Sequence, residues 1–301
     1  MTGVARVDAP TERRNPRTLD IDVRPTLEIL ELLNDEDATV PAAVRRALPA
    51  LAECVDVAAE RLRRGRRIHY FGAGTSGRLA VLDAAEIPTT FALDGDMVRA
   101  HHAGGTAAIG VAREGVEDQP AAGAQDATAV GSGDLAIGVT ASGRTPYVGG
   151  ALETARARGA FTVLVSCHPG APLAALADVH VCVDTGAEAI AGSTRLKAGT
   201  AQKLVLNAFS TAVMIRLGRT YSNLMVAMLA SNAKLRGRVL TVLMEASGAD
   251  EADARAALEA AGGDTRAALV MLLGGAGPEA AHAALAAHEG SVREALRALA
   301  G

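Results

Sequence analysis

Aromatic residues are scarce in this sequence: they make up 2% of its 301 residues, and tryptophan is absent. Platforms for single-stranded nucleic acid stack bases on several aromatic rings, so this composition argues against one. The net charge is −4 and no basic block dominates, which argues against a surface for duplex DNA or RNA. The arginines of the segment RLRRGRR, residues 61–67, are interpreted as the cationic end of a helix rather than as an RNA patch.

Cysteine is rare as well, with Cys54, Cys167 and Cys182 far apart in the chain. An odd number without close spacing is typical of reduced thiols in a cytoplasmic protein. The N-terminal residues contain no apolar run of the secretory kind, and no stretch approaches the ~18 apolar residues of a membrane span. We therefore expect a cytoplasmic location and no membrane or nucleic-acid partner.

Hydrophobic residues make up 49% of the chain, which is enough for a full core. In the middle of the chain, β-branched apolar runs, glycine turns and helical patterns alternate. This repetition predicts an α/β fold, a parallel-sheet three-layer αβα sandwich with helices on both faces. The expected strands are the runs RIHYFGAG, DLAIGVTASG, FTVLVSCHPG and VHVCVDTG.

Helical patterns dominate the two ends of the chain. One helix is expected near Leu27–Leu33, and a longer one from Asp37 or Thr39 to Gly65. After residue 192 the pattern becomes helical again, in TRLKAGTAQKLVLNAFSTAVMIRLG and NLMVAMLASNAKLRGRVLTVLMEASG.

The last fifty residues contain an internal repeat. The segment from Ala254 aligns with the one from Ala281, and each reads as a helix, a glycine break and a second helix. The expected organisation is an N-terminal lead-in with helices, an α/β domain, a helical connection and a small C-terminal helical unit, over residues 1–56, 57–220, 221–247 and 248–301.

Two glycine-containing loops carry the clearest chemical signal. GAGTSGRL, residues 72–79, follows an apolar strand and opens a helix, and TASGRTP, residues 140–146, does the same. Glycine permits close approach to an anion, and hydroxyls and helix N-terminal amides bind phosphate. The first loop is neither a Walker loop nor a Rossmann fingerprint. We expect the two loops to ring one sugar phosphate, with contacts from Thr75, Ser76, Gly77, Ser142, Arg144 and Thr145.

At these residues the chain resembles the sugar isomerase (SIS) domain proteins, and more closely the N-acetylmuramic acid 6-phosphate etherase family. The signature is GSTRLKAGTAQKLVLN, residues 192–207. The resemblance covers Thr11–Leu243 and includes TERRNPRTLDID, GAGTSGRLAVLDAAEIP and YSNLMVAMLASNAKLRGR. The animal glucokinase regulatory protein shares parts of these motifs in a much longer chain with two such domains.

The resemblance implies two functional glutamates, Glu86 as proton donor and Glu117 as base, with Glu114 as the second candidate for the base. Without it, both positions would be interpreted as exposed surface carboxylates. The sequence departs from the family around the first glutamate, where Ala85 replaces the usual Ser and Ile87 and Thr89 interrupt a Cys-Pro-Pro run. AHHAGG, residues 100–105, replaces a more apolar segment.

Three further residues are assigned to substrate by their place in the signature: Ser193 and Thr194 to direct contact, and Lys197 to the phosphate or the lactate carboxylate. The alternative for Ser193 is the N-cap of the helix that follows. His101 and His102 lack ligands at metal spacing, so no metal site and no cofactor are expected.

The expected function is a carbon–oxygen lyase that removes D-lactate from N-acetylmuramic acid 6-phosphate. The resemblance also implies a homodimer with its site near the subunit boundary. A regulator that senses sugar phosphates is the alternative. An aldose–ketose isomerase of the same fold is a third option, against which the signature at residues 192–207 argues.

Overall fold

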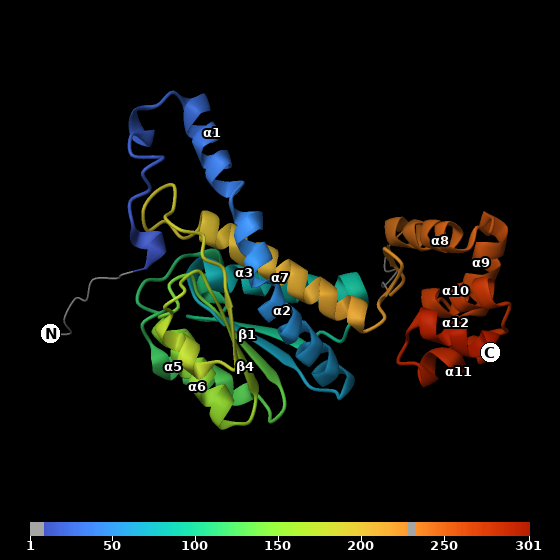
Figure 1. Ribbon diagram of the computed structural model, residues 1–301. Coiled ribbons are helices and arrows are strands. Elements are labelled where there is room, and N and C mark those ends of the chain that lie inside the picture. Colours follow the sequence, from blue (N-terminus) through green and yellow to red (C-terminus); the bar gives the residue numbers. More distant parts are fainter. Residues whose placement is uncertain (1–8, 228–232) are drawn as a thin grey trace. The chain divides into compact units, whose positions relative to one another are not determined.

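The computed structural model describes residues 9–227 and 233–301, which form two compact units (Figure 1). The first comprises residues up to 85 together with 96–210, and the second comprises residues 86–95 together with 211–301. Residues 1–8 of the expected lead-in, and residues 228–232 of the segment YSNLMVAMLASNAKLRGR, lie outside the described residues.

The first unit is built on a parallel sheet whose strand order is β2-β1-β3-β4-β5, which confirms the predicted α/β class. Each strand is short, and three of the five are wholly or almost wholly buried. The strands are β1 (Ile68–Gly72), β2 (Val98–His102), β3 (Leu135–Val139), β4 (Phe161–Ser166) and β5 (Val179–Cys182). The order reverses between β1 and β3, and ligands in open parallel sheets bind beside such a reversal, at the carboxyl ends of the strands.

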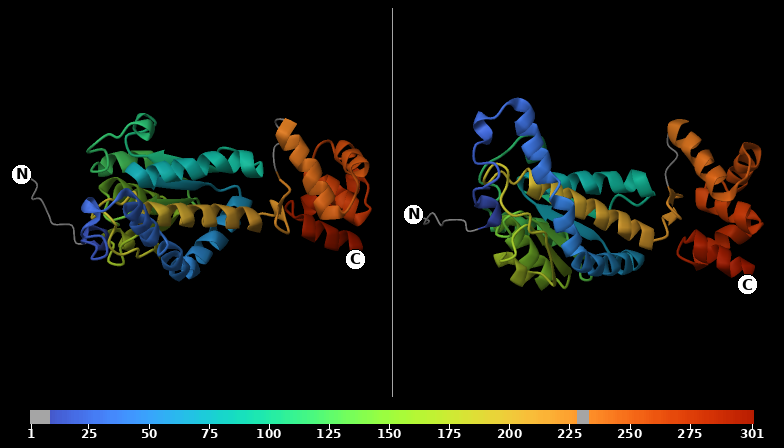
Figure 2. Two further views of the ribbon diagram at one scale, coloured as in Figure 1. Left: turned by 90° about the horizontal axis from the view of Figure 1, so that it is seen from above. Right: turned by 45° about the horizontal axis from the view of Figure 1, so that its top comes forward.

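Helices cover both faces of this sheet, as the views of Figures 1 and 2 show. Before the sheet lie η1 (Pro10–Glu12), η2 (Ile21–Val23), α1 (Thr26–Asp37) and α2 (Val40–Arg63). Within and after it lie α3 (Gly74–Phe91), α4 (Ala107–Gly110), α5 (Pro120–Asp126), η3 (Ala127–Ala129), α6 (Pro146–Ala157), η4 (Pro172–Leu176) and α7 (Lys197–Arg216).

Alternate residues of each strand build two separate cores. Phe71, Ala136 and Leu164 pack with α5 and α6 on one face. On the other face, Ile137 and Val163 meet α2 and α7, at residues that include Leu51 and Leu206. This division follows from the two-residue period of a strand, which sends successive side chains to opposite faces.

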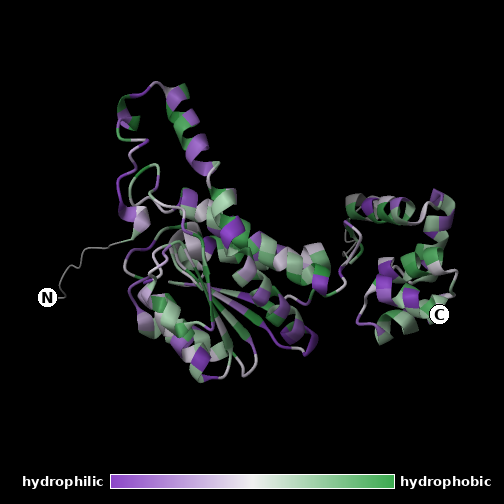
Figure 3. Ribbon diagram, viewed as in Figure 1, coloured by the Kyte–Doolittle hydropathy of each residue, from purple (hydrophilic) through white to green (hydrophobic). Residues whose placement is uncertain are grey.

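The helix α2 has nearly the bounds expected from the apolar periodicity, whereas α1 continues four residues beyond the expected Leu33, to Asp37. α2 ends at Arg63, and Gly65 follows with φ +70°, a conformation that favours glycine. Arg61 and Arg63 lie in the last turn, as expected for helix-end cations. On η2 and α1 several large apolar side chains are exposed, including Val23, Leu27 and Leu30, and Figure 3 shows hydrophobic colour along α1.

The second unit has its own core and contains the repeat. Its helices are α8 (Ala233–Ser247), α9 (Glu251–Ala260), α10 (Thr265–Gly274), α11 (Pro278–Ala287) and α12 (Val292–Ala300). α9 with α10, and α11 with α12, are the two helix pairs that the repeat predicted. Asp250, Asp264 and Ser291 cap three of these helices with side-chain acceptors.

The start of the second helical segment was expected to be helical and is not. Leu224–Met225 (β7) pairs antiparallel with Thr220–Tyr221 (β6). Ser222, at φ +50°, makes the tight turn between them. Among the described residues no single helix is long and apolar enough to cross a membrane, and only the bent pair α10 and α11 meets that criterion when taken together.

Candidate active site at the carboxyl ends of β1 and β3

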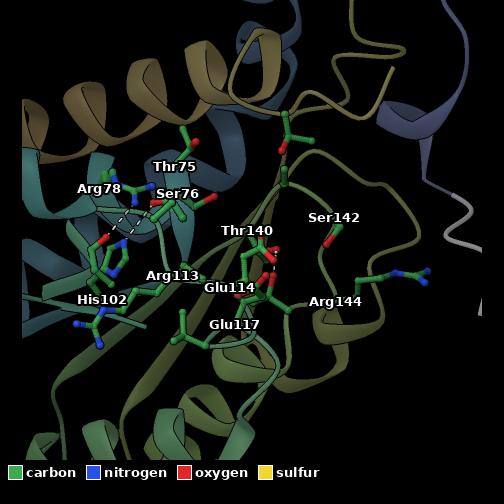
Figure 4. A pocket seen from close by; sticks show the side chains of 18 of the residues that line it. Thr75, Ser76, Arg78, His102, Arg113, Glu114, Glu117, Thr140, Ser142 and Arg144 are labelled. Carbon is green, nitrogen blue, oxygen red and sulfur yellow. Dashed lines mark hydrogen bonds between the residues drawn. The ribbon is translucent and has the colours of Figure 1, made fainter. Parts of the chain in front are cut away.

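A pocket of about 470 Å³ lies in the first unit, where the loops after β1 and β3 meet (Figure 4). Its position agrees with the topological rule, since β1 and β3 are the strands between which the order reverses. Both of the glycine loops line it. Six of the residues expected to contact substrate are brought together there: Thr75, Ser76, Ser142, Arg144, Thr145 and Thr194.

The first loop presents the N-terminus of α3 to the pocket. Thr75 and Ser76 lie in the first turn of this helix, so their hydroxyls stand beside amides that have no acceptor within the helix. Gly77, which was expected to touch the ligand, is not part of the lining. A Cβ on Gly77 would lie 2.5 Å from the carbonyl oxygen of Gly72 and 2.6 Å from the ring of His102. Gly77 therefore allows the turn to close, and its contact with the ligand stays a prediction.

The imidazole ring of His102 contacts the same loop. It is 5% exposed, and its Nε2 lies 3.3 Å from the carbonyl oxygen of Gly74, while Nδ1 lies 2.8 Å from that of Ala103. The ring lines the pocket beneath the start of α3. Among the described residues no group of three His, Cys, Asp or Glu side chains could hold a metal ion.

The second loop is fixed by its own threonines. The hydroxyls of Thr140 and Thr145 lie 2.7 Å apart, and Thr145 precedes the first residue of α6. Ser142 lines the pocket between them, whereas the side chain of Arg144 points away from the glutamates in Figure 4. A second helix N-terminus and a third hydroxyl thus reach the same cavity, which suits an anion with several oxygens.

Two of the three candidate glutamates line the pocket. Glu117 is half-buried, and its backbone carbonyl accepts a hydrogen bond of 2.9 Å from the amide of Tyr147 in the first turn of α6. Glu114 lines the pocket with an exposed side chain. Arg113 also lines it, and Arg78 does so while donating to the carbonyls of two residues at α4.

Glu86 does not line this pocket. The lining comes from the first unit, whereas Glu86 lies in the second, with an exposed side chain near the end of α3. Pro88 follows Glu86 by two residues, yet α3 continues to Phe91 with Pro88 inside it. A proline within a helix removes one backbone hydrogen bond and brings its ring against the carbonyl four residues earlier, at a cost of about 3 kcal/mol.

Lys197, which was assigned to a substrate anion, lies outside the pocket lining and against a buried carboxylate. Its side chain is 2% exposed and its Nζ donates a hydrogen bond of 2.7 Å to Glu36 Oε2. Arg17 binds the same carboxylate through Nε and Nη2. The two cations hold the pKa of Glu36 down to about 2. Lys197 therefore neutralises a buried carboxylate and is not part of the pocket lining.

Ser193 also lies outside the pocket lining and does not cap the helix. α7 begins at Lys197, and its first amides, those of Lys197 and Ala198, each donate 2.9 Å hydrogen bonds to the buried carboxylate of Glu188. A glutamate from the preceding loop thus takes the place of the expected serine cap. Thr194 remains in the pocket.

Several lining residues were not expected from the sequence: Glu12, Arg78, His102 as a support, Arg113 and Thr140. Thr140 and Arg78 lie within the two loop motifs, at positions that were not assigned a contact. Glu12 is far away in the sequence. Only its place in the segment TERRNP, which is part of the family resemblance, could have indicated it.

Comparison with known proteins agrees with this geometry. Residues 50–156 match the model of the glucokinase regulatory protein N-terminal SIS domain, and residues 109–212 match the SIS domain. The chain is 64% identical over 267 residues to an N-acetylmuramic acid 6-phosphate etherase of Thermobifida fusca, an alignment covering 89% of this chain and 88% of that one. It is 50% identical to one of Pectobacterium atrosepticum over 95% of both chains.

Among solved structures, a phosphoheptose isomerase from Francisella tularensis aligns at 17% identity and a TM-score of 0.48, covering 63% of this chain and 98% of that one. The two etherases are aligned over almost their whole length, and both exceed the identity at which membership of a family is secure. The chain therefore belongs to the N-acetylmuramic acid 6-phosphate etherase family.

Proposed function

We propose that this protein is a carbon–oxygen lyase that cleaves the D-lactyl ether of N-acetylmuramic acid 6-phosphate. Water is consumed, and the products are N-acetylglucosamine 6-phosphate and D-lactate. The observation that supports it most directly is the pocket itself, in which two hydroxyl-bearing helix N-termini converge beside the half-buried Glu117. The helix N-termini with their hydroxyls suit a phosphate, and the carboxylate of Glu117 suits proton transfer.

The phosphate is assigned to the two loops. Thr75 and Ser76 donate from the start of α3, and Ser142 and Thr145 from the loop that leads into α6. Backbone amides at both helix starts add donors, and the helix dipoles add positive potential. The phosphate thereby anchors one end of the sugar and leaves its carbons 1 to 3 to reach the carboxylates.

The chemistry requires one base and one acid. In the ring-opened sugar the aldehyde at carbon 1 acidifies the proton on carbon 2. A base removes that proton, and the electron pair forms the carbon 2–carbon 3 double bond as the carbon–oxygen bond to lactate breaks. An acid protonates the departing oxygen, and water then adds at carbon 3. General acid–base catalysis of this kind typically contributes ~10²–10⁴-fold per group.

Glu117 is the proposed base. It lines the pocket, is more buried than Glu114, and has its backbone held by the amide of Tyr147. A fixed backbone limits the positions that the carboxylate can reach, which favours a defined proton-transfer geometry. Glu114 is the second candidate for this role.

Glu86 is the proposed acid, and its exposed position leads us to place it in a second copy's pocket. We propose a homodimer in which the Glu86 carboxyl of one subunit completes the site formed by the other. The exposed Val23, Leu27 and Leu30 supply apolar surface of the kind that subunit contacts cover. A two-fold pair would make two such sites.

The steps move only protons, lactate and water, so no redox cofactor is required. A cytoplasmic location is proposed because the three cysteines are free thiols. A regulator that only binds sugar phosphates would use the same loops, but it would have no need of Glu117 in the pocket.

The test is lactate release from N-acetylmuramic acid 6-phosphate by wild type, by chelator-treated wild type, and by Glu86→Gln and Glu117→Gln variants. Glu53→Gln, on the exposed face of α2, is the matched control. Release by wild type and control, with losses of at least about 10²-fold in the two variants, supports the proposal. Wild type that binds sugar phosphates without releasing lactate would overturn it in favour of the regulator.

A further inference from the structure

Residues 9–18 form an N-terminal arm that is docked on the loop before α7. The amide of Gly192 donates to the carbonyl of Thr11 at 2.9 Å, and the hydroxyl of Thr18 donates to the carbonyl of Ala189 at 2.7 Å. Asn15 adds a third, longer bond to Ala187. Thr11, Asn15 and Thr18 are each 5% exposed or less. These contacts hold the arm against the loop at three places, Thr11, Asn15 and Thr18.

The docked arm places Glu12 in the lining of the pocket. Glu12 lines the cavity together with Thr194, from the loop on which the arm lies. Its Oε2 would lie only 3.0 Å from a Cβ at Gly192, a residue whose φ is +78°. Position 192 therefore leaves free the space that Glu12 occupies, and any larger side chain there would push against the carboxylate.

In the part of the chain that the structure describes, the Glu12 carboxylate has neither an ion pair nor a backbone amide donor, unlike two other carboxylates near the arm. Glu36 is paired with Lys197 and Arg17, and Glu188 accepts two backbone amides. Within the described residues no ion pair involves Glu12. A carboxylate held at a pocket without a protein partner is available to a donor on a ligand.

We propose that Glu12 is a substrate-contacting residue that accepts a hydrogen bond from a neutral donor of the sugar, a hydroxyl or the acetamido N–H. This inference rests on the proposed function, because it takes the ligand to be a sugar phosphate. The phosphate and the lactyl carboxylate are both anions that a carboxylate repels, so neither is its partner. Glu12 thereby disfavours ligands turned with an anionic group toward the arm and selects one orientation in the pocket.

Binding experiments test the inference separately from catalysis. Calorimetric titrations would use the product N-acetylglucosamine 6-phosphate and, in parallel, inorganic phosphate, with wild type, Glu12→Gln, Glu12→Ala and the control Glu53→Gln. The loss of a hydrogen bond to a charged acceptor should weaken sugar-phosphate binding about 10- to 100-fold in both Glu12 variants. Binding of inorganic phosphate should stay equal or become tighter, because a repulsive charge has been removed.

Two outcomes would overturn the inference. One is a loss of phosphate binding as large as that of sugar-phosphate binding, which would mean that Glu12 only shapes the loops. The other is no loss for either ligand. Thermal unfolding of the same variants shows whether the arm has undocked. Thr18→Val, which removes one hydrogen bond between the arm and the loop, is the positive control for undocking. Lactate release by wild type is scored on its own, so that failure of the lyase proposal is distinguishable from failure of this one.

Discussion

The ammonium nitrogen of Lys197 lies 2.7 Å from Oε2 of Glu36, and the two side chains are 2% and 3% exposed. This pair joins the end of α1 to the first residue of α7. Arg17, on the N-terminal arm, binds both oxygens of the same carboxylate, from Nε to Oε1 and from Nη2 to Oε2. The arm that carries Glu12, the helix α1 and the start of α7 are therefore held together by one buried carboxylate and its two cations.

Replacement of Lys197 by methionine tests this role. The variant leaves Glu36 buried with Arg17 as its remaining partner, and removing one member of a buried pair typically costs 3–5 kcal/mol. We expect a loss near the lower end, about 3 kcal/mol, in the free energy of unfolding measured with urea. Lys203→Met, at an exposed position of α7, should change it by less than about 0.5 kcal/mol. Unchanged stability in Lys197→Met would contradict the structural role and return Lys197 to the candidates for substrate binding.

Acid should destabilise the first unit through His69. The side chain is fully buried, its Nδ1 lies 3.1 Å from Nε2 of His101, and burial followed by the charge of His101 lowers its pKa to about 4. In the unfolded chain a histidine takes up its proton near pH 6.5. Since the unfolded state binds the proton first, stability is lost as the pH falls from about 6.5 to 4, by up to about 1.4 kcal/mol per pH unit.

The measurement is urea unfolding at several pH values between 4 and 7. His69→Phe keeps an aromatic ring in the stack with Phe71 and His101, so it should show a shallower dependence than wild type. His282→Gln, at an exposed position of α11, should keep the wild-type slope. Equal slopes in wild type and His69→Phe would mean that other groups carry the acid sensitivity.

Subunit mixing tests the proposal that Glu86 acts in the pocket of a second copy. Glu86→Gln and Glu117→Gln chains with different tags would be co-expressed, and the mixed dimer purified through both tags. One of its two sites would then combine an intact Glu86 with an intact Glu117, so about half of the wild-type lactate release should return. If both glutamates served one chain, each chain of the mixed dimer would be defective and no activity would return.

Two glycines of the second unit should respond in opposite directions to alanine. Gly237 lies within α8, and no heavy atom lies within 4 Å of the place that a Cβ would take, so Gly237→Ala should raise the free energy of unfolding by about 0.5–1 kcal/mol. Gly248 is equally open but has φ +74°, which L-residues adopt only at a cost, so Gly248→Ala should lower it by about 1 kcal/mol. Thermal melts of both variants would show whether the backbone conformation, rather than space, decides the result.

Much of this structure could be anticipated because local patterns and tertiary packing agree. The buried runs of β1, β3 and β4 are apolar throughout, and the helices of the C-terminal repeat follow the apolar period. β2 was missed because VRAHH is polar for a strand. It lies at the edge of the sheet and is only partly buried, so its composition carries little strand signal.

The sequence predicts the two loops of the site but not the residues from distant parts of the chain that complete or stabilise it. Hydroxyls and glycines after a strand are a local signal, and Ser76 and Ser142 do line the pocket. The roles of Lys197 and Glu12 depend on partners more than 150 positions away in the chain, such as Glu36 and Gly192. No spacing rule along the sequence can show that a lysine in a signature motif meets a buried glutamate instead of a ligand.

The bond between Glu36 and Lys197 also has a consequence for synthesis of the chain on the ribosome. The two residues are 161 positions apart, and translation adds about 5–20 residues per second. The carboxylate therefore emerges with Arg17 as its partner, roughly 8–30 seconds before the ammonium group of Lys197 has been made. During that interval the N-terminal arm lacks the loop at residues 187–192 that it contacts, and the pocket acquires Glu12 only after that loop has been made.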